Sequence, residues 1–119
     1  MEKEFTTKDS GKRQDFNSGM RRDTQEGKPR FDLIIPEGQN FKDCLLYRWA
    51  MLMSRGAKKY NERNWEKAKS QEEMDRFKAS AFRHFMQWVC NENDEDHVTG
   101  ILFNLNAYEW LKKKIKCKK

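Results

Sequence analysis

The sequence predicts an all-α fold, consisting of a compact helical domain with three main helices, an extended N-terminal arm and a basic C-terminal tail. Three segments carry apolar residues at the three- and four-residue spacing of a buried helix face. No segment shows the strict two-residue alternation of a convincing strand. At 119 residues the chain has the length of one domain, so an active site must be built from one core or shared between subunits.

Residues 1–26 form the predicted arm, because they are rich in charge, Thr, Ser and Gly and lack apolar periodicity. We expect this arm to be mobile and able to order on a partner. Residues 27–36 then hold an apolar stretch bounded by Pro29 and Pro36, which predicts an extended segment rather than a helix. On an extended segment Lys28 and Arg30 lie on one side.

The first helix is predicted over residues 41–54, with Gly56 as its C-terminal stop. Its buried face is expected to contain Leu45, Trp49 and Leu52 or Met53.

The second helix is predicted to begin after Ser70, an N-cap residue followed by acidic residues in the first turn, and to end near Cys90. Its apolar face is expected to consist of Met74, Phe77, Ala81, Phe85 and Trp88.

An acidic break at residues 91–97 separates that helix from a third one, in which apolar residues recur from Val98 to Leu111. The helical domain is therefore assigned to residues 27–111 and the basic tail to residues 112–119. This tail holds six lysines and the whole chain has a net charge of +6, so the middle of the chain is nearer to neutral. No sequence motif for reading nucleic acid is present, which makes nucleic acid an unlikely partner.

Composition excludes several other classes of protein. No apolar run of about 18 residues is present and the N-terminus is charged, so we expect neither a membrane protein nor an exported one, and we place the chain in the cytoplasm. The three cysteines form no close pair, which favours reduced thiols over a disulfide or zinc framework.

The segment from Gly56 to Glu66 combines cations, amides and aromatic rings between two helices. Lysines and an arginine bind phosphate oxygens, rings stack on bases, and an Asn amide reads a base edge. A nucleotide is therefore the natural ligand of this segment. The alternative is an ordinary turn, in which the cations are solvated and Tyr60 and Trp65 anchor the turn to the core.

Four carboxylates crowd the acidic break, namely Glu92, Asp94, Glu95 and Asp96. Like charges at this density indicate a neutralising Mg²⁺ or Mn²⁺, which binds oxygen ligands together with substrate phosphate. Alternatively, the carboxylates complement the dipole of the third helix. The spacing does not fit a calcium-binding EF-hand loop.

Three further residues lie near the acidic break in the predicted fold. Gly100 removes a side chain from the third helix, either for a ligand or for close helix packing. His84 and Asn104 are either ligands or satisfied polar groups of the core.

Taken together, these motifs resemble the N-terminal-type dATP/dGTP diphosphohydrolase family found in bacteriophages. The resemblance runs from about Gly27 to Trp110. It rests on GKPRFDLI at 27–34, GAKKY at 56–60, RNWEK at 63–67, RH at 83–84 with Trp88, DH at 96–97 and FN at 103–104.

This resemblance implies an all-α, MazG-like nucleotide pyrophosphohydrolase, in which carboxylate-bound Mg²⁺ helps water to attack a deoxynucleoside triphosphate and release monophosphate and pyrophosphate. The chain departs from the MazG hallmark, because it shows no clear Glu-x-x-Glu followed by Glu-x-x-Asp on two helices. Glu92-x-x-Glu95 is present but falls in the acidic break, so Glu66 and Asp96 would have to complete the site from elsewhere.

We therefore expect an oligomeric enzyme that hydrolyses dGTP or dATP with Mg²⁺ or Mn²⁺. The candidate phosphate ligands are Lys28, Arg30, Lys58, Lys59 and Arg83, and the base or sugar contacts are Tyr60, Asn64 and Trp65. The candidate metal ligands are Glu66, Glu92 and Asp96, and His84, His97 and Asn104 are candidates for orienting water, metal or substrate.

Two alternatives remain open. The incomplete carboxylate pattern is compatible with a phage protein that binds or sequesters a nucleotide without cleaving it. The lysine tail and the arm are compatible with a nucleic-acid accessory protein.

Overall fold

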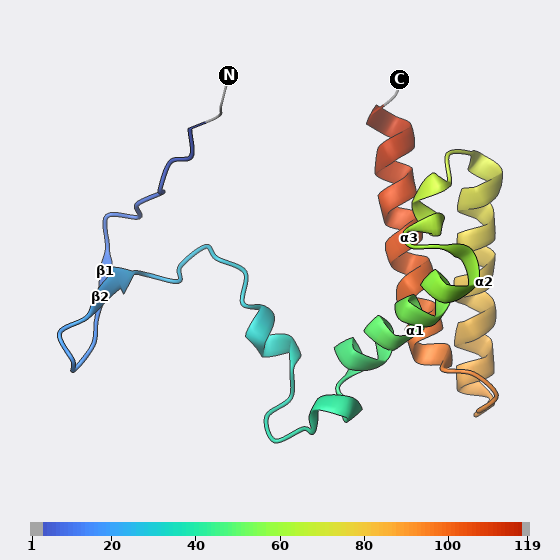
Figure 1. Cartoon of the computed structure of the whole chain (residues 1–119), viewed down its shortest axis with the longest axis horizontal. Coiled ribbons are helices and arrows are strands. Elements are labelled where there is room, and N and C mark those ends of the chain that lie inside the picture. The colour runs from blue at the N-terminus through green and yellow to red at the C-terminus, as the bar shows by residue number, and fades with distance from the viewer. Residues whose placement is uncertain (1–3, 118–119) are drawn as a thin grey trace. The chain divides into compact units, whose positions relative to one another are not determined.

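The computed structural model describes residues 4–117 and divides into two compact units, one up to Ile35 and one from Pro36 onward. Figure 1 labels the two strands of the first unit and the three α-helices of the second. No helix within residues 4–117 is both long and apolar enough to cross a membrane.

The first unit contains a short hairpin, which the sequence did not predict. Strands β1 (Arg13–Asp15) and β2 (Arg21–Asp23) are antiparallel, with Arg13 opposite Asp23 and Asp15 opposite Arg21. An ion pair of 2.7 Å joins Arg21 to Asp15. Because the strands are held by cross-strand charges and bury almost no side chain, they lack the apolar alternation that reveals a strand in a sequence.

The expectation of an extended segment between the two prolines is wrong for its middle part. Residues Phe31–Ile34 form one turn of 3₁₀ helix. A proline restricts mainly the residue before it, and Ile35 before Pro36 is indeed extended, at φ −92° and ψ 116°. Pro36 does not restrict residues 31–34, which therefore remain free to form a turn.

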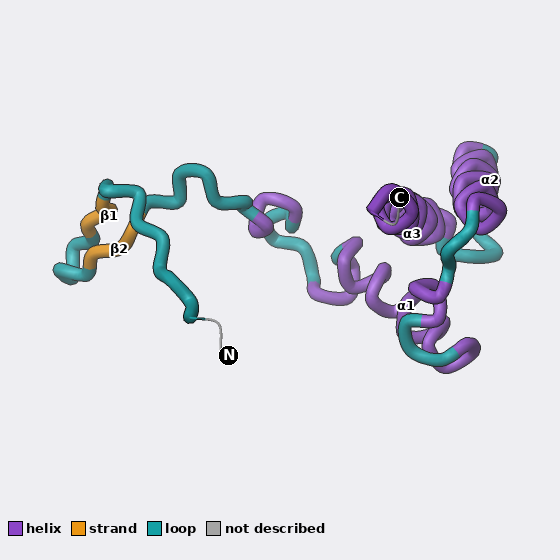
Figure 2. Tube along the Cα trace, turned by 90° about the horizontal axis from the view of Figure 1, so that it is seen from above, coloured by secondary structure: helices purple, strands orange, loops and turns teal. Residues whose placement is uncertain are grey.

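The second unit is helical, as the sequence predicted, and consists of α1 (Leu45–Tyr60), α2 (Gln71–Val89) and α3 (His97–Cys117). Helices α2 and α3 lie side by side along their length, and α1 contacts α3 (Figures 1 and 2). Ala68, Met74 and Leu111 form the buried cluster where the segment before α2 meets both helices.

Helix α1 begins and ends later than predicted. It starts at Leu45 after a 3₁₀ turn over Phe41–Asp43, continues through Gly56 and ends at Tyr60, followed by the C-cap residue Asn61 with a φ of 87°. A glycine inside a helix costs only about 1 kcal/mol relative to alanine, so Gly56 does not stop a helix unless its backbone turns left-handed. Asn61 makes that turn instead.

Much of the supposed loop from Gly56 to Glu66 is therefore helical. Its first part is the last turn of α1, and its final residues belong to a 3₁₀ turn over Asn64–Lys67. Only residues 61–63 between them are irregular.

The predicted start of α2 is confirmed. The backbone N–H of Glu73 donates to the Ser70 hydroxyl at 3.2 Å, and the Ser70 N–H donates to the Glu73 carboxylate at 3.1 Å, which completes a capping box.

The predicted apolar face of α2 is wrong in its second half. Met74 and Ala81 are buried, but Phe85 and Trp88 are 44% and 50% exposed. His84 and Gln87 occupy the half-buried positions there instead. The inward face of α2 is therefore polar near its C-terminal end.

Helix α3 includes most of the segment that the sequence assigned to a basic tail. Lysine is a good helix former, and the helix continues to Cys117. Lys114 donates to the carbonyl oxygens of Glu66 at 3.1 Å and Ala68 at 2.8 Å, so this lysine stabilises the chain before α2. Lys118 and Lys119 lie outside the described residues.

Candidate functional site

The helical unit contains a cavity of about 1060 Å³ lined by α1, the segment after it, α2 and the start of α3. Its side chains combine cations, carboxylates and aromatic rings. The cations are Arg55, Lys59, Arg63, Lys67, Arg76 and Arg83. The carboxylates are Glu73, Asp94, Glu95 and Asp96, and the rings belong to Tyr60, Trp65, Phe77 and Phe103.

Eight of the residues predicted for the site line this cavity. They are Lys59, Tyr60, Asn64, Trp65, Arg83, His84, Asp96 and Asn104. Lys58 and Glu92 are exposed residues of the same unit that do not line it. Lys28 and Arg30 belong to the first unit, where the Arg30 guanidinium pairs with Asp32 at 2.7 Å.

The sequence predicted Arg83 and His84 for the site but not Arg76 and Ser80, which extend them into a polar stripe on α2 that faces the cavity. Arg76, Ser80 and Arg83 recur there at i, i+4 and i+7, with His84 beside them. This helical spacing marks the stripe in the sequence, although apolar residues recur at similar intervals along the same helix. On α1, Arg55 and Lys59 are four residues apart and also face the cavity.

Trp65 belongs both to the cavity and to the core. Its ring meets Phe103 edge-on at a centroid distance of 6.1 Å and Trp110 at 5.1 Å, and Phe77 continues the cluster at 6.2 Å from Phe103. Trp110 does not line the cavity. The two interpretations of this residue, a stacking surface and a packed anchor, are therefore compatible.

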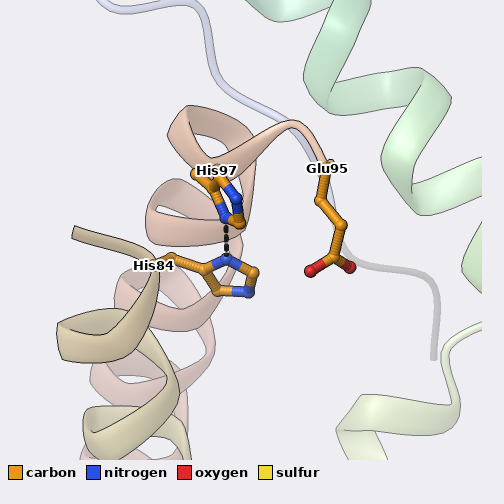
Figure 3. A group of neighbouring side chains, drawn as sticks. All are labelled: His84, Glu95 and His97. Carbon is orange, nitrogen blue, oxygen red and sulfur yellow. Dashed lines mark hydrogen bonds between the residues drawn. The ribbon is translucent and has the colours of Figure 1, made fainter. Parts of the chain in front are cut away.

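Two histidines from neighbouring helices meet at the cavity (Figure 3). His84 Nδ1 on α2 lies 2.9 Å from His97 Nδ1 on α3, and His97 Nε2 lies 2.8 Å from Asp94 Oδ1. His97 is 3% exposed, so it lies beneath the cavity rather than in its lining. The two histidines lie far apart in the sequence, but in the structure each contacts other polar side chains.

The Asp94 carboxylate determines which ring nitrogens carry protons. The hydrogen bond from His97 holds the pKa of Asp94 below its usual range, so the ionised carboxylate accepts the Nε2–H of His97. A His97 ring that carries its proton on Nε2 has a lone pair on Nδ1, which accepts the Nδ1–H of His84. Burial, followed by the Arg83 charge, lowers the pKa of His84, which favours its neutral ring.

Gly100 is required for this arrangement. A Cβ atom at this position would lie 2.9 Å from three atoms of the His84 ring. Of the two explanations considered for this glycine, close packing against α2 is the one that the geometry supports. Asn104, one turn further along α3, donates to the Gly100 carbonyl at 2.8 Å and is 6% exposed.

Asp96 connects α1 to the start of α3. Arg48 donates to its two carboxylate oxygens at 2.9 and 2.7 Å, and the Thr99 N–H donates to Oδ1 at 3.3 Å. The Arg48 guanidinium, more than any other group, lowers the pKa of Asp96. Asp96 thus caps α3 and is neutralised by an arginine, so a metal ion would have to compete with that arginine.

The structure does not bring the three predicted metal ligands together. Glu66 pairs with Arg63 at 2.6 Å. Within residues 4–117, groups of three side chains with ligand atoms inside 4.8 Å are His84–Glu95–His97 and Glu92–Asp94–His97. Neither group contains Glu66 or Asp96, and the roles of these two residues as ligands stay predictions.

Comparison with known proteins identifies one family. Residues 18–117 match the family model described as dATP/dGTP diphosphohydrolase, N-terminal. Because the match covers most of the chain, the chain belongs to that family. No curated protein and no solved structure matches it.

Proposed function

We propose that this member of the dATP/dGTP diphosphohydrolase family hydrolyses a purine deoxynucleoside triphosphate, dGTP or dATP, to the monophosphate and pyrophosphate, with Mg²⁺ or Mn²⁺ as cofactor. The observation that carries this proposal is the chemistry of one cavity, in which six cations, four carboxylates and four rings converge. Its volume of about 1060 Å³ is of the order that encloses a small organic ligand.

The cations support the phosphate end of the substrate. Arg76 and Arg83 on α2 and Arg55 and Lys59 on α1 approach the cavity from two helices. Guanidinium groups donate paired hydrogen bonds to phosphate oxygens, and a triphosphate has enough oxygens for several of them. These residues would bind and orient the triphosphate, and they would stabilise charge that develops on it.

Aromatic and amide side chains support the nucleoside end. Trp65, Phe77 and Phe103 offer ring faces or edges, and Asn64 offers an amide that both donates and accepts hydrogen bonds. Asn104 uses its amide N–H on Gly100, which leaves its carbonyl oxygen as an acceptor.

The residues at the cavity fit a divalent cation. Asp94 and Glu95 provide exposed carboxylate oxygens, and Mg²⁺ commonly uses one or two carboxylates together with substrate phosphates. A bound ion would supply charge neutralisation and a more acidic water molecule. His84 would hold or orient a water molecule through Nε2, which also lies 3.4 Å from Arg83 Nη2.

A non-catalytic nucleotide-binding protein is the second candidate. It is favoured by the pairing of Glu66 with Arg63 and of Asp96 with Arg48, which occupies two of the carboxylates that a catalytic metal would need. Such a protein would keep the cationic and aromatic cavity and would sequester its ligand.

One experiment separates the two functions. Purified protein is incubated with dGTP, dATP and the ribonucleotides in Mg²⁺ or Mn²⁺, and the products are resolved by chromatography. Metal-dependent release of pyrophosphate supports the enzyme, whereas tight binding of an intact nucleotide supports sequestration.

Arg76→Ala provides the matched variant for that experiment, and Lys112→Ala, an exposed position of α3 outside the cavity, provides its control. Removal of one charged phosphate contact corresponds to about 1.5–3 kcal/mol, so the Arg76 variant should raise KM roughly tenfold or more. An equal change of KM in both variants would show that the cavity is not the nucleotide site.

The proposal includes a homo-oligomer. Its support is a stripe on α2, defined by Phe82, Phe85, Met86 and Val89, in which every side chain is at least 44% exposed. These residues recur at i, i+3, i+4 and i+7, the spacing of a helix face that packs against another helix.

A further inference from the structure

We propose that His84, His97 and Glu95 form a binding site for a first-row transition-metal dication such as Mn²⁺. This inference adds a metal site to the proposed function. A role of the ion in catalysis rests on that function, whereas binding of the ion does not. It replaces a site made of carboxylates alone by one with two imidazole ligands.

The three side chains come from two helices and the turn between them. His84 lies on α2, His97 is the first residue of α3, and Glu95 precedes it by two residues. Their ligand atoms lie within 4.8 Å of one another. Figure 3 shows the two rings facing each other through their Nδ1 atoms, with the Glu95 carboxylate pointing toward the His84 ring.

His97 has the hydrogen-bonded partner that is typical of a metal-binding histidine. Asp94 accepts its Nε2–H at 2.8 Å, which leaves the Nδ1 lone pair directed at His84. A carboxylate behind the remote nitrogen is the usual arrangement for a histidine that binds metal, because it holds the tautomer and increases the basicity of the ligating nitrogen. The buried position of His97, at 3% exposed, holds its ring in place.

In the absence of metal, one proton lies between the two histidines. With His97 protonated at Nε2, His84 Nδ1 carries this proton and donates a hydrogen bond to His97 Nδ1 across 2.9 Å. A dication that binds both nitrogens takes the place of this proton, which moves to His84 Nε2, so the ring stays neutral and ligates through Nδ1. The weak 3.4 Å contact of Nε2 with Arg83 is given up in that step.

The spacing of the nitrogens is compatible with neighbouring positions of an octahedral ion. With metal–nitrogen bonds of about 2.1 Å, nitrogens 2.9 Å apart lie at an angle of about 90°. A tetrahedral ion such as Zn²⁺ would need them about 3.4 Å apart. Imidazole suits transition metals better than Mg²⁺, which prefers oxygen ligands. Mn²⁺ and Co²⁺ combine octahedral geometry with acceptance of nitrogen.

The second group of potential ligands, Glu92, Asp94 and His97, competes with the first. It would use the other nitrogen of His97, and a neutral imidazole has only one lone pair. Because Asp94 accepts a proton from that nitrogen, ligation there would break an existing hydrogen bond.

Metal titration without nucleotide tests the site. Co²⁺ is followed by its visible absorption and Mn²⁺ by loss of the electron paramagnetic resonance signal of the free ion. We expect one ion of either metal per chain and much weaker competition from Mg²⁺. Glu95→Gln and His84→Gln should each weaken binding at least tenfold, and Asp94→Asn should weaken it about 10–100-fold.

Glu92→Gln and Glu109→Gln are the controls, because Glu92 belongs only to the competing group and Glu109 is an exposed residue of α3. Both should bind like the wild type, and circular dichroism verifies that every variant is folded. Loss of binding in Glu92→Gln with retention in Glu95→Gln would overturn the proposal, as would the absence of Mn²⁺ and Co²⁺ binding.

Failure of this site and failure of the proposed function give different results. Nucleotide hydrolysis with Mg²⁺ by a protein that binds neither Mn²⁺ nor Co²⁺ would refute the metal site and keep the enzyme. Tight Mn²⁺ binding that requires Glu95, without cleavage of any nucleotide, would support the site and refute the enzyme.

Discussion

Trp65 has neighbours on two sides, and each side predicts a different effect of removing its ring. Toward the core it contacts Trp110, and toward the cavity it presents a half-buried face. Trp65→Ala should destabilise the fold by about 2–3 kcal/mol, less than a fully buried tryptophan. It should also weaken nucleotide binding by about 1–3 kcal/mol, as expected for lost base stacking. Thermal unfolding and calorimetric titration measure the two effects.

The matched control is Trp110→Ala, which removes the partner ring without changing the cavity lining. It should destabilise the protein and leave the affinity of the folded fraction unchanged. Lys59→Ala should weaken nucleotide binding and leave the stability almost unchanged, because an exposed lysine contributes little to folding. Wild-type affinity in Trp65→Ala would assign this ring to the core alone.

At Gly100, an added methyl group would collide with the His84 ring. Alanine favours a helix by about 1 kcal/mol over glycine, but its Cβ would meet the His84 ring at 2.9 Å. We expect Gly100→Ala to destabilise the wild type, measured by urea unfolding, and to stabilise a His84→Ala background in which the clash is absent.

Gly56→Ala tests the same reasoning where no clash exists. This glycine lies inside α1 and a Cβ there has no neighbour within 4 Å among the described residues. The substitution should therefore stabilise the fold by about 1 kcal/mol. Destabilisation by Gly56→Ala, or equal effects of Gly100→Ala in both backgrounds, would contradict this account.

At the scale of elements, the pair Arg48–Asp96 ties α1 to the N-terminus of α3. The arginine lowers the pKa of Asp96 below its unfolded value of about 3.9. A lowered carboxyl pKa contributes stability above the unfolded pKa, and this contribution disappears as the pH falls through the folded pKa. The pair should therefore stabilise the protein at neutral pH and not in strong acid.

Asp96→Asn tests this contribution. It should lower the free energy of unfolding at neutral pH by about 1 kcal/mol, since Arg48 is partly solvent-screened. The difference from wild type should shrink as the pH falls below about 4. Urea unfolding at a series of pH values measures it, with Glu109→Gln as an exposed control. A difference that stays constant with pH would show that the charge of Asp96 is not responsible.

At the scale of the whole molecule, the exposed stripe on α2 predicts self-association. Phe82→Ser combined with Phe85→Ser should reduce the mass measured by light scattering from an oligomer to a monomer, because it removes the two largest apolar side chains of the stripe. Leu33→Ser with Ile34→Ser, at two exposed apolar positions of the first unit, should leave the mass unchanged. A monomeric wild type would refute the prediction.

What the sequence determined by itself is local. The start of α2 was predictable because the capping box joins residues three apart, and the existence of three helices was predictable because apolar spacing reflects the geometry of each helix alone. Residues 56–66 could likewise be singled out for their cations and rings, with Lys59, Tyr60 and Trp65 among the residues that line the cavity, although most of that segment is helical or 3₁₀.

The tertiary structure decided which faces of the helices meet. Periodicity placed Phe85 and Trp88 inside, but the packing of α2 on α3 turned His84 inward, because Gly100 leaves room there for an imidazole. His84 and His97 are 13 residues apart and Arg48 and Asp96 are 48 apart, so no local pattern relates them. Contacts between helices depend on how each helix is rotated about its axis, and that rotation is set by the fit of all the side chains in the core.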